Sequence, residues 1–317
     1  MEAGIQIVAG LALLALGGEG VVRGAVGVAR RLGLSALLIG LTLVGFGTSA
    51  PELITSVDAA LQGSPGIAIG NVLGSNIGNI LLILALVVLI RPLTVNPAAV
   101  GRDGALVVAV STVLALIALL FGELNRWIGV LLLSALVLYV FAIWRIERRG
   151  GAAAEMHEGE GHTHDPVPQE LWQSALFALG GLGLLVWGAD LLVNGAITTA
   201  RVAGVSETVI GLTIVAIGTS LPELVATLAA ALKGRSDVAF GNIVGSNLYN
   251  ILGILGVTAI IHPIAIPKDI SLVDWAVLIG SATLLMIFAA TGRRITRLEA
   301  VVLLAAYAVY VAYLIMR

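Results

Sequence analysis

The 317-residue chain contains no cysteine and few charged residues, and both absences limit what it can be. Without cysteine there is no disulfide framework and no thiolate metal site. Charged residues make up 11% of the chain and hydrophobic residues 59%, whereas soluble domains are about a quarter charged and about half apolar. The first residues, MEAGIQ, lack the basic segment of a cleavable signal peptide. We therefore expect the first apolar run to remain in the protein as a helix.

Long apolar runs dominate the chain, and several exceed 18 residues with almost no charge. They do not alternate with period two, which excludes a strand barrel. The pattern predicts an all-α membrane protein with ten transmembrane helices. The predicted spans are 3–20, 33–60, 67–90, 104–121, 127–146, 170–192, 205–232, 238–260, 272–290 and 298–316.

The positions of Lys and Arg predict the orientation of these spans. If the N-terminus lies outside, thirteen of the 17 Lys and Arg residues fall in inner loops. Both termini are therefore predicted to lie outside.

Two sequence motifs occur twice at one constant offset. Residues 41–56, LTLVGFGTSAPELITS, correspond to residues 212–227, LTIVAIGTSLPELVAT. GNVLGSNIGNILL from Gly70 likewise corresponds to GNIVGSNLYNILG from Gly241, again 171 residues later. The first and sixth spans also match at this offset.

The repeat predicts a five-helix unit at 1–146, an inner linker at 147–169 and a second five-helix unit at 170–317. Because five is odd, the second unit enters the membrane inverted. Inverted repeats are typical of secondary transporters, whose sites lie at the midplane between the halves. The alternative is a duplicated scaffold without transport. The best-matched segments are polar, which favours transport.

The linker carries His157, His162 and His164 among acidic residues. Such a segment can bind a transition metal or act as a solvated tether.

Glu52 and Glu223 lie within predicted spans, where a charged side chain costs about 2.5–3.5 kcal/mol on insertion scales. No Lys or Arg lies near the middle of a span to pair with them. A cation is therefore predicted as the missing charge. The alternative is a protonated, purely structural pair.

Oxygen-bearing side chains recur at four-residue spacing, which places them on one helix face. All are hard donors, suited to Na⁺ or Ca²⁺ rather than to soft metals. Small hydroxyls can also serve only as interhelical hydrogen bonds. Besides the glutamates, the set comprises Thr48, Ser49, Ser75, Asn79, Thr219, Ser220, Ser246 and Asn250.

Pro51 and Pro222 directly precede the glutamates. A proline inside a helix frees the carbonyl four residues earlier. That carbonyl is a candidate ligand, or the proline is only a packing kink. Glu19 and Asp190 lie late in their spans and are expected to be interfacial and inert.

GTSAPEL, GTSLPEL, GNVLGSN and GNIVGSN closely resemble the paired α-repeats of the sodium/calcium exchanger family, of the prokaryotic type. The resemblance implies a ten-helix fold with four central helices around the ion sites. It also implies that the first and sixth spans slide across that core, and it points to a prokaryotic inner membrane.

By position, the resemblance makes Glu52 and Glu223 ligands of both Ca²⁺ and Na⁺, and the Thr and Ser residues ligands mainly of Na⁺. Asn79 and Asn250 complete the ring, with backbone carbonyls near Gly45 and Ala216. Some members carry aspartate where this chain has Asn250. The ring charge is then −2 if both acids ionise, which matches one Ca²⁺ and leaves the Na⁺ stoichiometry open.

The sequence therefore predicts a Na⁺/Ca²⁺ antiporter working by alternating access. Alternatives are H⁺-driven antiport of Ca²⁺ or another divalent cation, because burial disfavours a charged carboxylate, and a cation channel. No enzyme activity, resident cofactor, nucleic acid or obligatory protein partner is predicted. The expected partners are the transported ions and the lipid bilayer.

Overall fold

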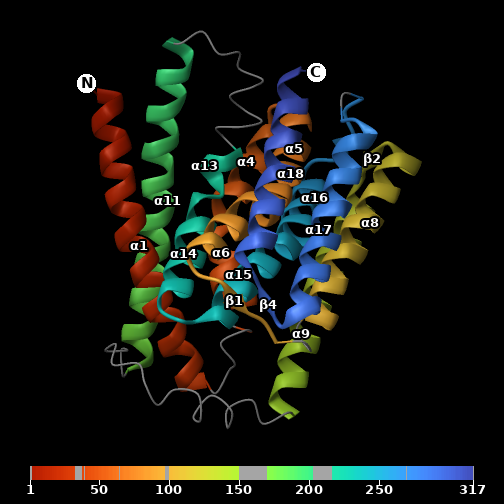
Figure 1. The fold of residues 1–317 in the computed structure, drawn as a ribbon. Coiled ribbons are helices and arrows are strands. Elements are labelled where there is room, and N and C mark those ends of the chain that lie inside the picture. Colours follow the sequence, from red (N-terminus) through yellow and green to blue (C-terminus); the bar gives the residue numbers. More distant parts are fainter. Residues whose placement is uncertain are drawn as a thin grey trace.

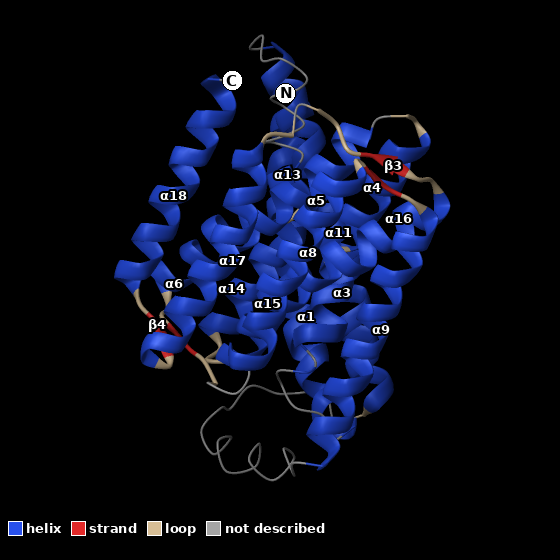
Figure 2. Cartoon of the chain, turned by 90° about the vertical axis from the view of Figure 1, so that its right-hand side faces the viewer, coloured by secondary structure: helices blue, strands red, loops and turns tan. Residues whose placement is uncertain are grey.

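Helices make up nearly all of the computed structural model (Figures 1 and 2). It describes residues 2–32, 38, 40–63, 65–96, 100–149, 170–202, 216–268 and 270–316. In these ranges eight helices are long and apolar enough to cross a membrane. The protein is thus a multi-pass helical membrane protein, as predicted.

Helix α1 (Glu2–Leu32) and helix α11 (Leu171–Val202) stand side by side at one edge of the bundle (Figure 1). They run antiparallel and pack backbone to backbone. A Cβ on Gly17 would lie 2.8 Å from the Gly181 carbonyl oxygen, and one on Gly188 would lie 2.9 Å from the Gly10 carbonyl oxygen. Helix α1 reaches well beyond the predicted end at residue 20, because glycines keep the contact with α11 close along its length.

The repeated motifs form the centre of the bundle. One set consists of η1 (Gly40–Val44), α3 (Gly45–Thr48), α4 (Ala50–Leu61), α5 (Pro65–Gly78), η2 (Asn79–Leu84) and α6 (Ala85–Ile90). The other consists of α13 (Ala216–Thr219), α14 (Leu221–Leu232), α15 (Ser236–Leu248), η5 (Tyr249–Ile254) and α16 (Leu255–Ile261). Spans 65–90 and 236–261 are 72% and 89% buried, against 17% for 126–146. The polar motifs thus lie where lipid does not reach.

The outer helices are α8 (Ala105–Phe121, preceded by η3, Val100–Gly104), α9 (Arg126–Arg149), α17 (Leu272–Gly292) and α18 (Arg297–Met316). Four two-residue strands add a detail that the all-α prediction lacked. They are β1 (Leu93–Thr94), β2 (Glu123–Leu124), β3 (Ile264–Ala265) and β4 (Arg294–Ile295). β1 pairs with β4 and β2 with β3, both antiparallel, at opposite ends of the bundle (Figure 2).

The second and seventh predicted spans differ most from the prediction. In the second, residues 33–37 and 39 lie outside the described part, and the helix that follows breaks at Ser49, whose φ and ψ are −83° and 9°. In the seventh span residues 203–215 lie outside the described part, and the helix breaks at Ser220. Ten spans and the inverted repeat therefore remain predictions, as do the unit boundaries at 1–146 and 170–317. Residues 150–169, with the three linker histidines, are outside the described part too.

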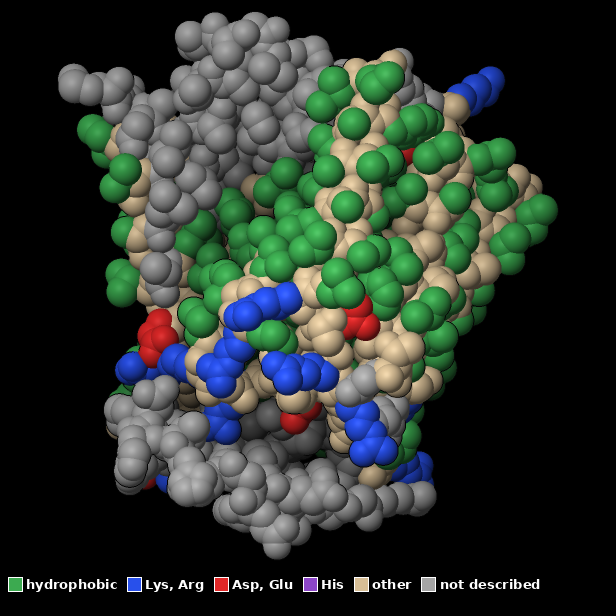
Figure 3. All heavy atoms as spheres, viewed as in Figure 1, with side chains coloured by type: hydrophobic (Ala, Val, Ile, Leu, Met, Phe, Trp, Pro, Cys, Tyr) green, Lys and Arg blue, Asp and Glu red, His purple; other side chains and the backbone are tan. Residues whose placement is uncertain are grey.

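Charge is distributed unevenly along the bundle axis. Hydrophobic side chains cover the middle of the face in Figure 3, and Lys and Arg gather mainly at its lower end. The first residues of α1 and the last of α18 lie at the opposite, upper end (Figure 1). This arrangement agrees with the predicted placement of both termini on one side, away from the basic loops.

Candidate cation site

The two GTS-x-PE segments place their functional side chains at a break between two helices. Thr48 ends α3, and Glu52 lies in the first turn of α4. Pro51 occupies the first turn of α4, where its missing N–H costs no helical hydrogen bond. Both readings of Pro51 assumed a continuous helix, a freed carbonyl or a packing kink, but the proline lies at the start of a new helix. Glu52 is thus held near a helix N-terminus, where backbone N–H groups favour negative charge.

Glu223 is placed in the same way by the second motif. It lies in the first turn of α14, after the break at Ser220, with Pro222 directly before it. Both glutamates are 0% exposed.

The two carboxylates are held by hydroxyls from opposite halves of the chain. Ser49 Oγ donates to Glu223 Oε1 at 2.7 Å, and Ser220 Oγ donates to Glu52 Oε1 at 2.8 Å. Each serine lies three residues before the glutamate of its own motif. The reciprocal bonds therefore bring Glu52 and Glu223 to one place between the halves.

Several buried polar atoms of the repeated motifs have no hydrogen-bond partner in the described part of the chain. They are the second oxygens of both glutamates (Oε2), both amide atoms of Asn79 and of Asn250, and the hydroxyl of Ser75. An unsatisfied buried polar group costs about 1–3 kcal/mol, and a charged one more. Unpartnered oxygens gathered at buried carboxylates are the arrangement that a dehydrated cation requires.

Asn79 and Asn250 lie in π-helical segments rather than in regular α-helix. Asn79 begins η2, and Asn250 is the second residue of η5. Segment η2 lies against α14, and η5 lies against α4. Each amide is therefore carried by an element that packs on the glutamate helix of the other half. Such π segments are frequent at functional sites because they redirect side chains.

Two further asparagines hold the glutamate segments in place. Asn71 Nδ2 donates to the Glu52 carbonyl oxygen at 3.1 Å and to Ser56 Oγ at 3.0 Å. Asn242 does the same to the Glu223 carbonyl oxygen at 3.3 Å and to Thr227 Oγ1 at 2.8 Å. These side chains position the site, and their amide groups are already engaged.

The remaining hydroxyls bond to other groups of the repeated motifs. Thr48 Oγ1 donates to the Val44 carbonyl oxygen at 3.0 Å, and Ser246 Oγ lies 3.4 Å from the Gly45 carbonyl oxygen, to which it donates. Thr219 Oγ1 donates to Asn71 Oδ1 at 3.3 Å.

Hydrogen bonds between the halves thus link Ser49 to Glu223, Ser220 to Glu52 and Ser246 to Gly45, and the role of the whole set as cation ligands stays a prediction. The Gly45 carbonyl is part of this set. Ala216 begins α13, and its side chain is outside the described part.

The charge of the cluster is acidic. In the described ranges, no Lys or Arg forms an ion pair with Glu52 or Glu223. These ranges also contain no group of three or more His, Cys, Asp or Glu side chains that could hold a metal. The site therefore consists of two carboxylates supplemented by neutral oxygens, a donor set that suits Na⁺ and Ca²⁺ and disfavours soft metals.

Two buried acids outside the cluster were missed by the sequence analysis. Tyr139 Oη donates to Asp103 Oδ1 at 3.1 Å, and Tyr310 Oη donates to Asp274 Oδ1 at 2.9 Å. Both pairs follow the 171-residue offset, and this was the signal that could have found them. They tie α9 to η3 and α18 to α17.

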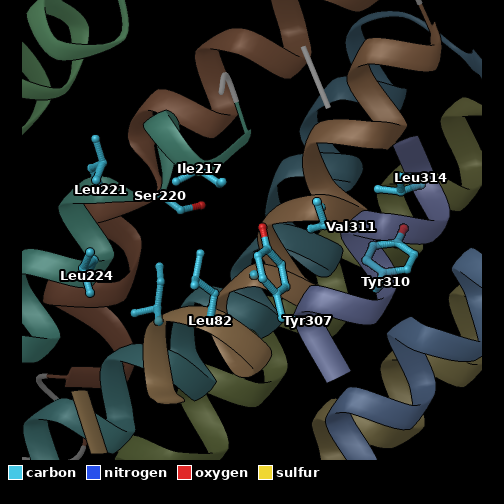
Figure 4. A pocket seen from close by; sticks show the side chains of 12 residues that line it. Leu82, Ile217, Ser220, Leu221, Leu224, Tyr307, Tyr310, Val311 and Leu314 are labelled. Atoms are coloured by element: carbon cyan, nitrogen blue, oxygen red, sulfur yellow. The ribbon is translucent and has the colours of Figure 1, made fainter. Parts of the chain in front are cut away.

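A pocket leads to the cluster from one side of the molecule (Figure 4). Ser220 and Leu224 line one wall, Tyr307 and Tyr310 of α18 line the other, and Gly78 lies between. The Ser220 side chain points toward α18 (Figure 4). The volume is about 40 Å³, which is room for a few water molecules. Water and small cations can therefore approach the serine that holds Glu52.

A model of the family described as "Sodium/calcium exchanger protein" matches residues 3–145 and again 173–316. The chain belongs to this family. The putative antiporter CaxA of Alkalimonas amylolytica is 40% identical over 314 residues, 98% of each chain. The sodium/calcium exchanger MaX1 of Methanosarcina acetivorans is 32% identical over 336 residues, 96% of each chain.

Among solved structures, the fold is similar to the sodium-calcium exchanger NCX_Mj soaked with Na⁺ and Sr²⁺. The TM-score is 0.82 at 32% identity, covering 98% of this chain and 99% of the other. The resemblance stated from the motifs is confirmed, and this chain is a membrane protein of the cation/calcium antiporter kind.

Proposed function

We propose that this family member exchanges Na⁺ for Ca²⁺ by alternating access at the cluster around Glu52 and Glu223. The observation that carries the proposal is the set of buried oxygens without partners, namely both Oε2 atoms, the Oδ1 atoms of Asn79 and Asn250, and Ser75 Oγ. The Oε2 atoms belong to the carboxylates held by reciprocal serine hydrogen bonds, and the two asparagines lie in segments that pack on the glutamate helices. A bound cation supplies the missing partner to all of these oxygens at once.

Competition for the same oxygens couples the two ions. With both glutamates ionised the cluster carries −2, which one Ca²⁺ neutralises. Na⁺ ions bound at the same oxygens exclude Ca²⁺. An empty cluster leaves two uncompensated charges in a buried place, which disfavours movement of the unloaded protein. Exchange then follows, because the carrier moves only when it is loaded.

One-sided access supports a carrier rather than a channel. The pocket at Gly78 and Ile217 reaches Ser220. The equivalent pocket in the other half is larger, about 400 Å³, but Ser49 is not part of its lining. There the corresponding positions hold Tyr249 and Phe46, whose ring centroids are 4.5 Å apart.

The aromatic pair lines this pocket at the positions that Gly78 and Ile217 hold in the first half. A Cβ on Gly253 would come within 2.6 Å of the Tyr249 ring, so the ring lies directly over this glycine. At the corresponding positions the first half has Gly78 and Leu82. The two routes to the cluster are thus unequal in one conformation, as alternating access requires.

Proton coupling is the second candidate. The observation that favours it is the pair of buried carboxylates, which can release a cation by taking up protons. The hydroxyls of Ser49 and Ser220 favour Na⁺, because proton binding needs no additional oxygen ligands.

The proposal includes the orientation of the helix bundle in the membrane. The basic end of the bundle faces the cytoplasm, and both termini face outward across a prokaryotic inner membrane. The linker at 147–169 is then cytoplasmic.

The test is Ca²⁺ flux in proteoliposomes under separately imposed Na⁺ and pH gradients. We expect Ca²⁺ flux to follow the Na⁺ gradient at constant pH. Flux that follows the pH gradient without Na⁺ would establish the proton antiporter instead. Single-channel currents in a planar bilayer would contradict both antiport mechanisms.

A further inference from the structure

The paired helices α1 and α11 do not sit symmetrically on the core. Gly18 of α1 packs on Val225 of α14, since a Cβ on Gly18 would lie 3.3 Å from the Val225 carbonyl oxygen. The equivalent of Val225 in the first half is Ile54 of α4, and Ile54 is 64% exposed. The pair therefore covers one of two corresponding core surfaces and leaves the other uncovered.

An ion pair accompanies the covered surface. Glu19 of α1 accepts a hydrogen bond from Lys233 Nζ at 2.6 Å, and it also pairs with Arg23 one turn along α1. Lys233 is the C-cap of α14, the helix that carries Glu223. The charged groups thus connect the peripheral pair directly to the core helix of the site. Glu19 is not the inert interfacial residue that the sequence analysis expected.

The uncovered surface has no equivalent charge pair among the described residues. At the 171-residue offset Glu19 corresponds to Asp190, and Lys233 corresponds to Gln62. Asp190 is exposed and has no ion pair with a described residue. Gln62 donates to Asp58 Oδ2 at 2.7 Å, within its own helix segment. If the pair moved to the uncovered surface, Asp190 would approach an amide rather than an ammonium group.

We propose that Glu19 and Lys233 form an electrostatic latch that holds the α1–α11 pair against α14. The latch makes the two positions of the pair unequal in free energy, so that this conformation is the more populated one. The corresponding surfaces around Val225 and Ile54 offer two docking positions, and only the first has a charge partner among the described residues. The inference rests on the proposed alternating access, but it concerns the resting ratio of the two conformations and not the ion transported.

The latch is tested by measuring the conformational ratio directly. The chain has no cysteine, so cysteines at Leu16 on α1 and Leu298 on α18, which are 63% and 74% exposed, accept spin labels without background. Double electron–electron resonance on the full-length labelled protein in lipid nanodiscs then gives the proportion of each distance component. Circular dichroism confirms that each variant is folded.

We expect Lys233→Gln to lower the ratio of the distance component that matches this structure to the other component by about two- to fivefold. This is the effect expected from losing a partly exposed ion pair. Glu19→Gln should have the same effect, and the double variant should lose no more than either single one, because both remove one interaction. Lys268→Gln, a charge loss at an exposed residue in the loop after β3, should leave the ratio unchanged.

A variant that moves the lysine from position 233 to position 62 makes the test specific to the ion pair. Gln62→Lys gives Asp190 an ammonium partner, so Lys233→Gln combined with Gln62→Lys should favour the second component. An unchanged ratio in Lys233→Gln, or no opposing shift on adding Gln62→Lys, would overturn the latch. If the ratios shift as expected while vesicles show no cation-driven Ca²⁺ flux, the latch stands and the proposed function falls.

Discussion

Single side chains from opposite halves hold each carboxylate of the site. Glu223 depends on Ser49, and Glu52 depends on Ser220, at 2.7 Å and 2.8 Å. Each glutamate still has one buried oxygen with no partner in the described chain. The site is thus marked by buried carboxylate oxygens that can still accept a bond. Single substitutions can remove these oxygens one at a time.

Glu52→Gln and Glu223→Gln should each weaken Ca²⁺ binding by more than the roughly 10–100-fold that the loss of a mere supporting contact costs at a metal site. The substitution keeps the shape of the side chain but removes half of the formal charge of the cluster. The measurement is Ca²⁺ affinity by isothermal titration calorimetry, together with flux. Glu123→Gln, at an exposed carboxylate in β2, is the control. Near-normal Ca²⁺ affinity in either site variant would remove these residues from the site.

At the scale of elements, small residues decide which helices approach closely and which space stays open. Gly181 of α11 faces the backbone of α1, whereas a Cβ placed on Gly183, two residues further on, would meet no atom within 4 Å. In the core, Gly78 likewise has open space around it, whereas the ring of Tyr249 at the corresponding position lies against Gly253. Whether a glycine position on a helix forms a tight contact or borders open space therefore depends on the atoms that face it.

Gly181→Ala should lower the free energy of unfolding by about 1–3 kcal/mol, the usual cost of overpacking. Its Cβ would lie 2.7 Å from the Gly17 carbonyl oxygen, which belongs to backbone and cannot turn aside. Gly183→Ala is the matched control on the same helix, and it should be neutral or slightly stabilising because alanine favours helix. The measurement is reversible unfolding in detergent. Equal effects of the two substitutions would contradict the close packing of α1 on α11.

Gly78→Tyr should slow Ca²⁺ flux by about tenfold or more, since an added barrier of about 1.4 kcal/mol already does so. The new ring would occupy much of the pocket of about 40 Å³ that leads to Ser220. Gly78→Ala should transport almost normally, because a Cβ there meets nothing within 4 Å. Initial rates of uptake in proteoliposomes decide between them. Normal rates in the tyrosine variant would mean that cations reach the site by another route.

At the scale of the whole molecule, the distribution of charge relates the bundle to its membrane. Lys and Arg gather mainly at one end of the face in Figure 3, and the ends of α1 and α18 lie at the other. Retention of basic loops in the cytoplasm then predicts which end faces outward.

Cysteines at Glu2 and Met316 should react with a membrane-impermeant maleimide added outside intact cells. A cysteine at Gly151, in the predicted cytoplasmic linker, should react only after the membrane is opened. The absence of native cysteine makes each signal unambiguous. Labelling of the linker position in intact cells would reverse the proposed orientation.

The membrane class, the duplication and the residue types of the site could all be predicted from the order of residues along the chain. Long apolar runs require helices in lipid, and the buried Glu52 and Glu223 require a partner that no Lys or Arg provides. Helical spacing predicted Thr48 and Glu52 on one helix face, but a break at Ser49 puts them on two different helices. These properties follow from local composition and period, which need no knowledge of distant contacts.

How the two halves meet became visible only in the folded molecule. The bonds of Ser49 to Glu223 and of Ser220 to Glu52 join residues far apart in the chain, and no local pattern specifies such pairs. The same holds for the ion pair of Glu19 with Lys233 and for the contact of the Tyr249 ring with Phe46. The two halves have nearly the same motifs, so the sequence alone cannot show which of two equivalent packings is occupied. That choice depends on side-chain volume and charge at contacts that exist only after folding.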